Sequence, residues 1–84
     1  MRELLESIAI KCKKITGKNQ TDRRKELFEL LCKQNGIEFT FVGEKPGGHA
    51  CGINEMSNCY RFFPRCGYGR YNYSPCYEIK KVEL

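Results

Sequence analysis

Four cysteines and the single histidine of this 84-residue chain fall close together in its second half. The group consists of Cys51, Cys59, Cys66, Cys76 and His49. Four thiolates, or three thiolates and one imidazole, suit the tetrahedral coordination that Zn²⁺ prefers. However, no two cysteines have the C-x₂-C spacing by which zinc fingers and ribbons are recognised. The residues therefore leave three states open, a zinc site, free thiols or disulfides, and Zn²⁺ is the one cofactor that they suggest.

The spacing of His49 and Cys51 also allows a second chemistry. Residues i and i+2 of a strand point to the same side, so the imidazole could activate the thiol as a nucleophile. His49 follows two glycines, which favour a turn, and no carboxylate or amide stands directly beside it to orient the ring. The chain also lacks a phosphate-binding glycine loop. We therefore expect a binding protein and no enzymatic activity.

Basic residues are concentrated in the first half of the chain. Seven of the 15 Lys and Arg residues lie between positions 11 and 25, where Asp22 is the only acidic residue. Such a cluster is typical of a surface that binds phosphate or an acidic protein, although a solvated helix end is the alternative. Arg23 and Arg24 would oppose the dipole at the start of a helix, so we expect a partner contact to explain them. The residues predicted to bind are Lys11, Lys13, Lys14, Lys18, Arg23 and Arg24.

A second basic set is interleaved with aromatic residues in the second half. Its predicted binding residues are Arg61, Arg65, Arg70, Tyr71 and Tyr73. Tyr and Arg stack on nucleic-acid bases and anchor protein interfaces. A small sheet could instead use its aromatic side chains for its core. Phe62 and Phe63 cannot both point inward on one strand, so at least one is expected on the outer face or near an edge.

The formal net charge of +5 and these two sets lead to two functional hypotheses. The first is a nucleic-acid-binding module that holds phosphates with the basic cluster and bases with the Tyr/Arg set. The second is a protein-binding inhibitor or adaptor, comparable in size and class to phage anti-defence proteins such as anti-CRISPR proteins. Salt distinguishes them, because nucleic-acid binding releases counterions and weakens steeply with salt, whereas an aromatic protein interface weakens only modestly.

Helical periodicity predicts the elements that carry the basic cluster. Apolar residues recur at helical spacing over residues 4–15 and again up to about residue 34, and a glycine follows each segment closely. Thr21 or Asp22 is expected to cap the second helix. Antiparallel packing of the two helices would then gather the basic cluster at the end that holds their connection.

The second half of the chain has the alternating pattern of strands. Pro64 and Pro75 are expected to stop their strands or restrict them to sheet edges. The predicted strand segments are 37–42, 49–53, 60–63, 68–73 and 76–84.

These elements predict an α+β fold, an N-terminal helical hairpin packed on a small antiparallel β-sheet. We expect a single domain over residues 1–84, with the hairpin in 1–36 and a β-rich half in 37–84. The residues expected to be buried together are Leu4, Ile8, Leu27, Phe28, Leu31, Phe39 and Phe41. Because no apolar run reaches membrane-spanning length and no secretory signal follows Met1, we expect a cytoplasmic location without membrane contact. Thiols are then favoured over disulfides.

Overall fold

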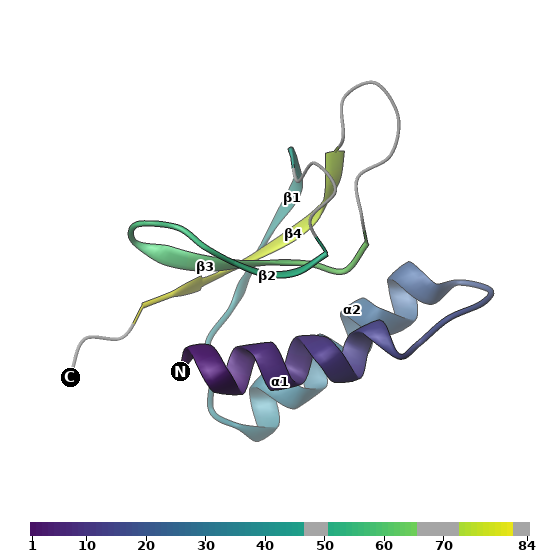
Figure 1. Ribbon diagram of the computed structural model, residues 1–84, viewed down its shortest axis with the longest axis horizontal. Coiled ribbons are helices and arrows are strands. Elements are labelled where there is room, and N and C mark those ends of the chain that lie inside the picture. Colours follow the sequence, from purple (N-terminus) through teal and green to yellow (C-terminus); the bar gives the residue numbers. More distant parts are fainter. Residues whose placement is uncertain (47–50, 66–72, 82–84) are drawn as a thin grey trace.

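The computed structural model describes residues 1–46, 51–65 and 73–81, and it places two helices against one face of a four-stranded sheet (Figure 1). The elements are α1 (Arg2–Lys13), α2 (Gln20–Gln34), β1 (Thr40–Pro46), β2 (Gly52–Glu55), β3 (Cys59–Phe63) and β4 (Tyr73–Lys80). The strand order is β1-β4-β3-β2, and every pair is antiparallel. The predicted α+β class, with a helical hairpin on an antiparallel sheet, is therefore confirmed.

The connection between α1 and α2 turns on residues with left-handed backbone. Gly17 has a φ of +92° and Asn19 a φ of +59°, a region that Gly and, less readily, Asn adopt. Asn19 is the N-cap of α2, so the expected caps Thr21 and Asp22 lie inside the first turn instead. That prediction is wrong because the left-handed Asn19 lets the helix begin earlier. The Asn19 side chain makes no capping hydrogen bond.

A Schellman motif ends α2 and moves the start of the first strand. Gly36, with a φ of +68°, donates its N–H to the carbonyl of Lys33 at 3.3 Å. The N–H of Ile37 donates to the carbonyl of Cys32 at 2.8 Å, which completes the motif. Because the helix end uses the N–H of Ile37, β1 begins at Thr40 and not at residue 37 as its alternation predicts.

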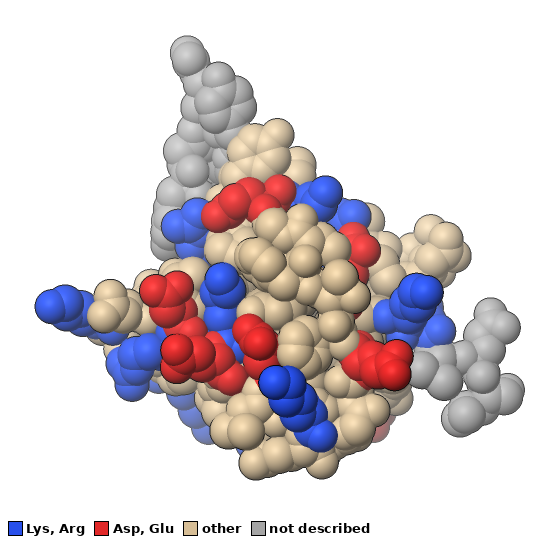
Figure 2. Space-filling view, turned by 180° about the vertical axis from the view of Figure 1, so that it is seen from behind, with Lys and Arg blue, Asp and Glu red and all other residues tan. Residues whose placement is uncertain are grey.

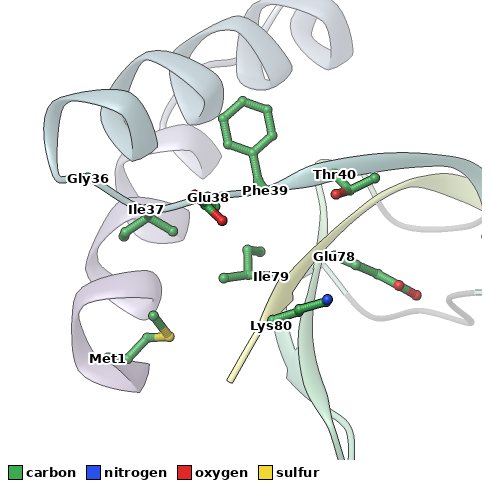
Figure 3. A pocket seen from close by; sticks show the side chains of 9 residues that line it. All are labelled: Met1, Gly36, Ile37, Glu38, Phe39, Thr40, Glu78, Ile79 and Lys80. Carbon is green, nitrogen blue, oxygen red and sulfur yellow. The ribbon is translucent and has the colours of Figure 1, made fainter. Parts of the chain in front are cut away.

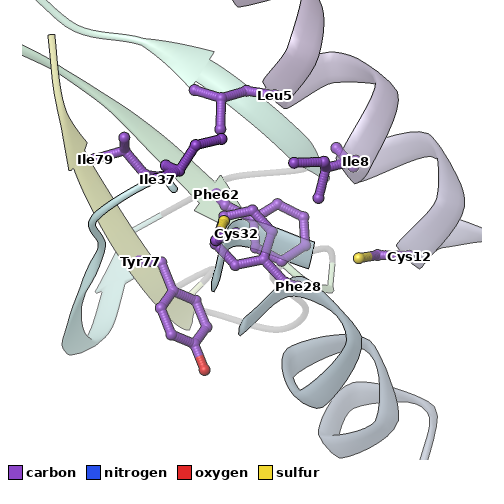
Figure 4. Packing of buried hydrophobic residues seen from close by; sticks show 10 residues of the cluster. Leu5, Ile8, Cys12, Phe28, Cys32, Ile37, Phe62, Tyr77 and Ile79 are labelled. Carbon is purple, nitrogen blue, oxygen red and sulfur yellow. The ribbon is translucent and has the colours of Figure 1, made fainter. Parts of the chain in front are cut away.

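The core lies between the helices and the sheet face that they cover (Figure 4). Phe28 of α2 is at its centre, with its ring stacked on Phe62 at a centroid separation of 4.0 Å and 5.2 Å from the ring of Tyr77. α1 adds four buried residues at the spacing that one helical face requires, namely Leu5, Ile8, Ala9 and Cys12.

Two residues of the predicted core are misplaced. Leu4 is 40% exposed because Leu5 leads the buried stripe of α1. Phe41 is 48% exposed although its ring lies on the Tyr77 side of the sheet, 5.1 Å from that ring. Ile8 and Phe28 are buried as predicted, and the partly buried residues packed against the core include Leu27, Leu31 and Phe39.

Pro75 lies within β4, which is an inner strand, so the expectation that it restricts its strand to an edge is wrong. The ladder between β3 and β4 ends at the pair Phe62–Tyr77, and Pro75 pairs with Glu44 of β1. Among the described residues this part of β4 has one strand neighbour, where a missing N–H is tolerated.

Phe62 and Phe63 are both buried, and Phe62 alone of the two belongs to the helix-facing cluster, as alternation requires.

The other strand predictions differ from the structure mainly at their ends. The segment 60–63 corresponds to β3, and the segment 49–53 overlaps β2, which begins at Gly52. The segments 68–73 and 76–84 overlap β4, which begins at Tyr73, and residues 68–72 and 82–84 lie outside the described residues.

Candidate nucleic-acid interface

The basic cluster gathers at the end of the helical hairpin that holds the connection between α1 and α2. Residues 11–13 end α1, residues 14–19 connect the helices and Arg23 lies near the start of α2 (Figure 1). Blue side chains project at the corresponding left-hand end of Figure 2, with acidic side chains further inward. Lys11, Lys14 and Lys18 are exposed, as is Arg23. We call these four residues the connector patch.

Lys13 belongs to the same cluster but packs along the sheet. A Cβ atom placed on Gly52 of β2 would lie 3.0 Å from Cε and 3.1 Å from Nζ of Lys13. The flexible end of Lys13 could move away from such an atom, but Gly52 has a φ of +99°, which side chains rarely adopt, so the backbone conformation favours a glycine there. Lys13 is exposed, but because the end of its side chain lies beside Gly52 of β2, we leave it out of the connector patch.

Arg24 has a structural role that the sequence argument missed. Its Nε donates to the carbonyl of Ile15 at 2.9 Å, and its Nη2 donates to that of Lys13 at 3.1 Å. Its Nη1 donates to the carbonyl of Pro64 at 2.9 Å. The guanidinium thus satisfies carbonyls at the C-terminal end of α1 and ties them to the end of β3. A partner contact is the expected explanation of Arg24, and these bonds to the adjacent end of α1 give it a structural explanation that the dipole of α2 alone does not.

The ion pairs of the described residues all lie outside the basic cluster. They are Arg2–Glu6, Arg2–Glu55, Arg61–Glu78, Arg65–Glu44 and Lys81–Glu55. Within the described part of the chain, no residue between 11 and 25 takes part in one. Arg23 makes one long bond, from Nη1 to the carbonyl of Thr16 at 3.4 Å. No described carboxylate therefore lies within ion-pair distance of the charged groups of the connector patch.

The predicted Tyr/Arg set has a different environment. Arg61 donates from Nε to Oε2 of Glu78 at 3.0 Å, across the ladder between β3 and β4. Nη2 of Arg65 lies 3.6 Å from Oε2 of Glu44. Tyr73 is 47% exposed. Arg70 and Tyr71 lie outside the described residues. The two described arginines of the set thus pair with carboxylates of β4 and β1.

Phe41 and Lys25 form a contact that the sequence argument did not anticipate. Nζ of Lys25 lies 4.4 Å from the centroid of the Phe41 ring, a cation–π contact between α2 and β1. The alternation of residues 37–42 predicts that Phe41 is in the core, and Lys25 is predicted only as one charge of the basic cluster. No sequence signal could pair them, because the contact depends on how α2 crosses the sheet.

The free cysteines with shifted pKa values are buried. Burial raises the pKa of Cys12 to about 11, that of Cys32 to about 12 and that of Cys76 to about 11. Thiols with such pKa values are almost fully protonated at neutral pH and are poor nucleophiles. Cys12 and Cys32 act as small apolar residues of the core, as predicted.

The predicted zinc ligands that lie among the described residues do not form a metal site. Cys59 and Cys76 are free thiols and Cys51 is disulfide-bonded, so the expected preference for thiols is wrong at Cys51. His49 and Cys66 lie outside the described residues. Among those that the structure does describe, no three His, Cys, Asp or Glu side chains are grouped as a metal site. A disulfide sulfur is neither a thiolate ligand nor a nucleophile. Zinc binding stays a prediction, which elemental analysis tests.

A pocket of about 360 Å³ opens between the start of α1, residues 36–40 and the end of β4 (Figure 3). In Figure 3 the side chains of Glu78 and Lys80 point away from Met1 and Ile37. The carboxylate of Glu78 already accepts hydrogen bonds from Arg61. No histidine or cysteine is among the described residues that line this pocket.

Comparison with family models, with curated proteins and with solved structures gives no match for this chain. Neither helix of the described residues has the length and apolar character that crossing a membrane requires.

Proposed function

We propose that this protein is a non-catalytic nucleic-acid-binding module that holds the phosphate backbone with the connector patch. The observation that supports this function is the distribution of charge. Exposed Lys and Arg side chains gather at one end of the hairpin, and the ion pairs of the described residues lie elsewhere. Basic side chains without carboxylate partners can release counterions from a nucleic acid, and this release supplies most of sequence-independent affinity.

Arg24 gives the connector patch a fixed frame. Its three hydrogen bonds hold the end of α1, the connection and the end of β3 together. They also occupy carbonyl oxygens at the negative end of the α1 dipole, which would otherwise oppose an approaching phosphate. The lysines around this frame contact phosphates as mobile point charges, so the binding does not depend on base sequence.

The test is a pair of charge-reversal variants with equal net charge. K14E/K18E changes the connector patch, and K33E/K80E makes the same change at two other exposed lysines. Lys14 and Lys33 each stand at the C-terminal end of a helix, so the dipole cost of reversal is matched. Fluorescence anisotropy with a labelled oligonucleotide of about 12 nucleotides measures affinity across a salt series.

We expect K14E/K18E to abolish binding at low salt, and K33E/K80E to retain it with the steep salt dependence of the parent. Four phosphate contacts correspond to a slope of about −3 in log K against log salt. Equal losses in both variants would mean that net charge alone attracts the nucleic acid. If the parent binds no oligonucleotide even at low salt, this function is wrong, and an inhibitor or adaptor that docks on an acidic protein replaces it.

A further inference from the structure

Phe41 is an exposed aromatic residue beside a basic one on the same side of the molecule as α2. Its residue surface is 48% exposed, and Nζ of Lys25 lies 4.4 Å from the centroid of its ring. Lys25 lies in α2, six residues after the N-cap Asn19, which corresponds to about 9 Å along the helix axis. A bound strand of a few nucleotides could therefore extend from the connector patch to the ring.

The ring of Phe41 packs against Tyr77, a residue that is itself held in place by contacts with α2. Phe41 pairs with Tyr77 in the ladder between β1 and β4, and the two ring centroids are 5.1 Å apart. The Tyr77 hydroxyl donates to Oε2 of Glu29 at 2.5 Å, and its ring contacts Phe28 in the core. A β-bulge follows Phe41, between Phe41 and Glu44. A ring supported in this way loses little conformational freedom when a ligand covers it.

We infer that Phe41 is a stacking platform for one unpaired base and that Lys25 binds the adjoining phosphate, so the protein prefers single-stranded to double-stranded nucleic acid. This inference rests on the function proposed above. The preference follows because the base faces of a duplex are covered by their neighbours, whereas an unpaired base offers a free face to an aromatic side chain.

The cation–π contact indicates how the platform would be occupied. The ammonium of Lys25 lies over the ring on a mobile four-carbon stem, and it can move aside without any change of backbone. A base that takes its place covers more of the ring than the ammonium does. The displaced ammonium then lies beside the phosphate next to that base, so that one residue pair binds both parts of a nucleotide.

The experiment compares three polyanions of equal length, about 12 units, with the parent, Phe41→Leu and Phe41→Tyr. The polyanions are oligothymidylate, the same phosphodiester chain without bases, and a DNA duplex. Leu keeps apolar bulk at position 41 but has no aromatic face, and Tyr keeps the face. Thermal unfolding of each variant identifies any loss that comes from the fold.

We expect the parent to bind oligothymidylate about tenfold more tightly than the chain without bases, because stacking adds to the phosphate contacts. Phe41→Leu should lose that difference and keep its affinity for the duplex, while Phe41→Tyr should retain the difference. If Phe41→Leu binds all three polyanions as the parent does, the stacking role is wrong and the connector patch still stands. If K14E/K18E fails to weaken any of the complexes, the proposed function itself is wrong.

Discussion

The two ends of α1 both carry basic side chains, and the fold treats those charges in opposite ways. At the N-terminal end, Arg2 pairs with Glu6 and with Glu55 of β2, each at 3.0 Å. Glu55 also accepts a hydrogen bond from Lys81 at 2.9 Å. At the C-terminal end, Lys11 and Lys14 are exposed, and among the described residues neither takes part in an ion pair.

This difference separates charges that serve the fold from charges that require another explanation. Paired charges join elements distant in the sequence, as Arg2 joins α1 to β2. Unpaired like charges close together repel one another, and at the end of α1 the helix dipole offsets part of that repulsion. Within the basic cluster Arg24 has the most structural contacts, three hydrogen bonds to backbone carbonyls, whereas Arg23 has one long bond and Lys25 one ring contact. Substituting one charged residue at a time shows whether its charge stabilises the fold or is left unpaired.

The largest effect is expected for Arg24→Ala. The substitution removes three hydrogen bonds from a charged donor and leaves carbonyls at the end of α1 without their partner. Because part of the lost bonding is recovered with water, we expect a cost of about 2–3 kcal/mol, measured by urea unfolding. Arg24→Lys should also be destabilised, since one ammonium cannot replace the forked guanidinium on three carbonyls.

Arg23→Ala is the matched control for Arg24. Arg23 is the preceding residue of the same helix turn, and its one bond to Thr16 is long, at 3.4 Å. We expect its free energy of unfolding to stay within about 0.5 kcal/mol of the parent. Equal stability of the two variants would show that the Arg24 bonds do not form in solution.

A smaller effect is expected for Arg61→Ala. Arg61 and Glu78 are opposite one another on β3 and β4, and their side chains are 27% and 32% exposed. Removing Arg61 leaves a partly desolvated carboxylate, so we expect a loss of about 1 kcal/mol. A double-mutant cycle with Glu78→Ala measures the coupling between the two side chains. A coupling energy of zero would place Arg61 with the unpaired charges, and the Tyr/Arg set would again be a candidate binding surface.

The sequence predicted the architecture because periodicity is a local property. The helical spacing of Leu5, Ile8 and Cys12 and the change to alternation near residue 37 both follow from which residues are apolar. The fate of individual charges depends on contacts across the fold. Arg24 donates a hydrogen bond to the carbonyl of Pro64, which lies 40 positions further along the chain, and no local pattern around either residue predicts that contact.

The same limit explains why Phe41 was assigned to the core. Alternation gives the side of the sheet on which a residue lies, and Phe41 does lie on the side of Tyr77. The alternation pattern does not give the extent to which α2 covers that side of the sheet. Whether a residue on the inner side is buried or half exposed is decided by where the helix crosses the strand.

Neutralising the connector patch should have little effect on stability. Lys14→Ala/Lys18→Ala removes two exposed charges from a cluster of like charges. We expect the free energy of unfolding to change by less than about 0.5 kcal/mol, and to rise where the relief of repulsion outweighs the lost interaction of Lys14 with the α1 dipole. Urea unfolding at low and high salt checks the sign. A clear loss of stability would show that these lysines have structural partners and would remove the basis of the proposed interface.

The smallest effect is expected at the opposite end of α1, where Glu55 connects Arg2 and Lys81. The hydrogen bond from Lys81 and the charges of Lys81 and Arg2 lower the pKa of Glu55 below its ordinary value of 4.5. A carboxyl with a lowered folded-state pKa stabilises the fold above the unfolded pKa, and this contribution is lost as pH falls through the folded value. Glu55→Gln should therefore be slightly less stable than the parent at neutral pH.

The difference between Glu55→Gln and the parent should disappear in acid, below the lowered pKa of Glu55. Because these charges are exposed, salt near 1 M should reduce the difference as well. Salt would thus weaken the N-terminal end of α1 while it relieves repulsion at the connector patch, so its effects at the two ends have opposite signs. If Glu55→Gln and the parent have the same dependence on pH and salt, the Glu55 pairs do not form in solution. The two ends of α1 would then not differ in how they hold charge.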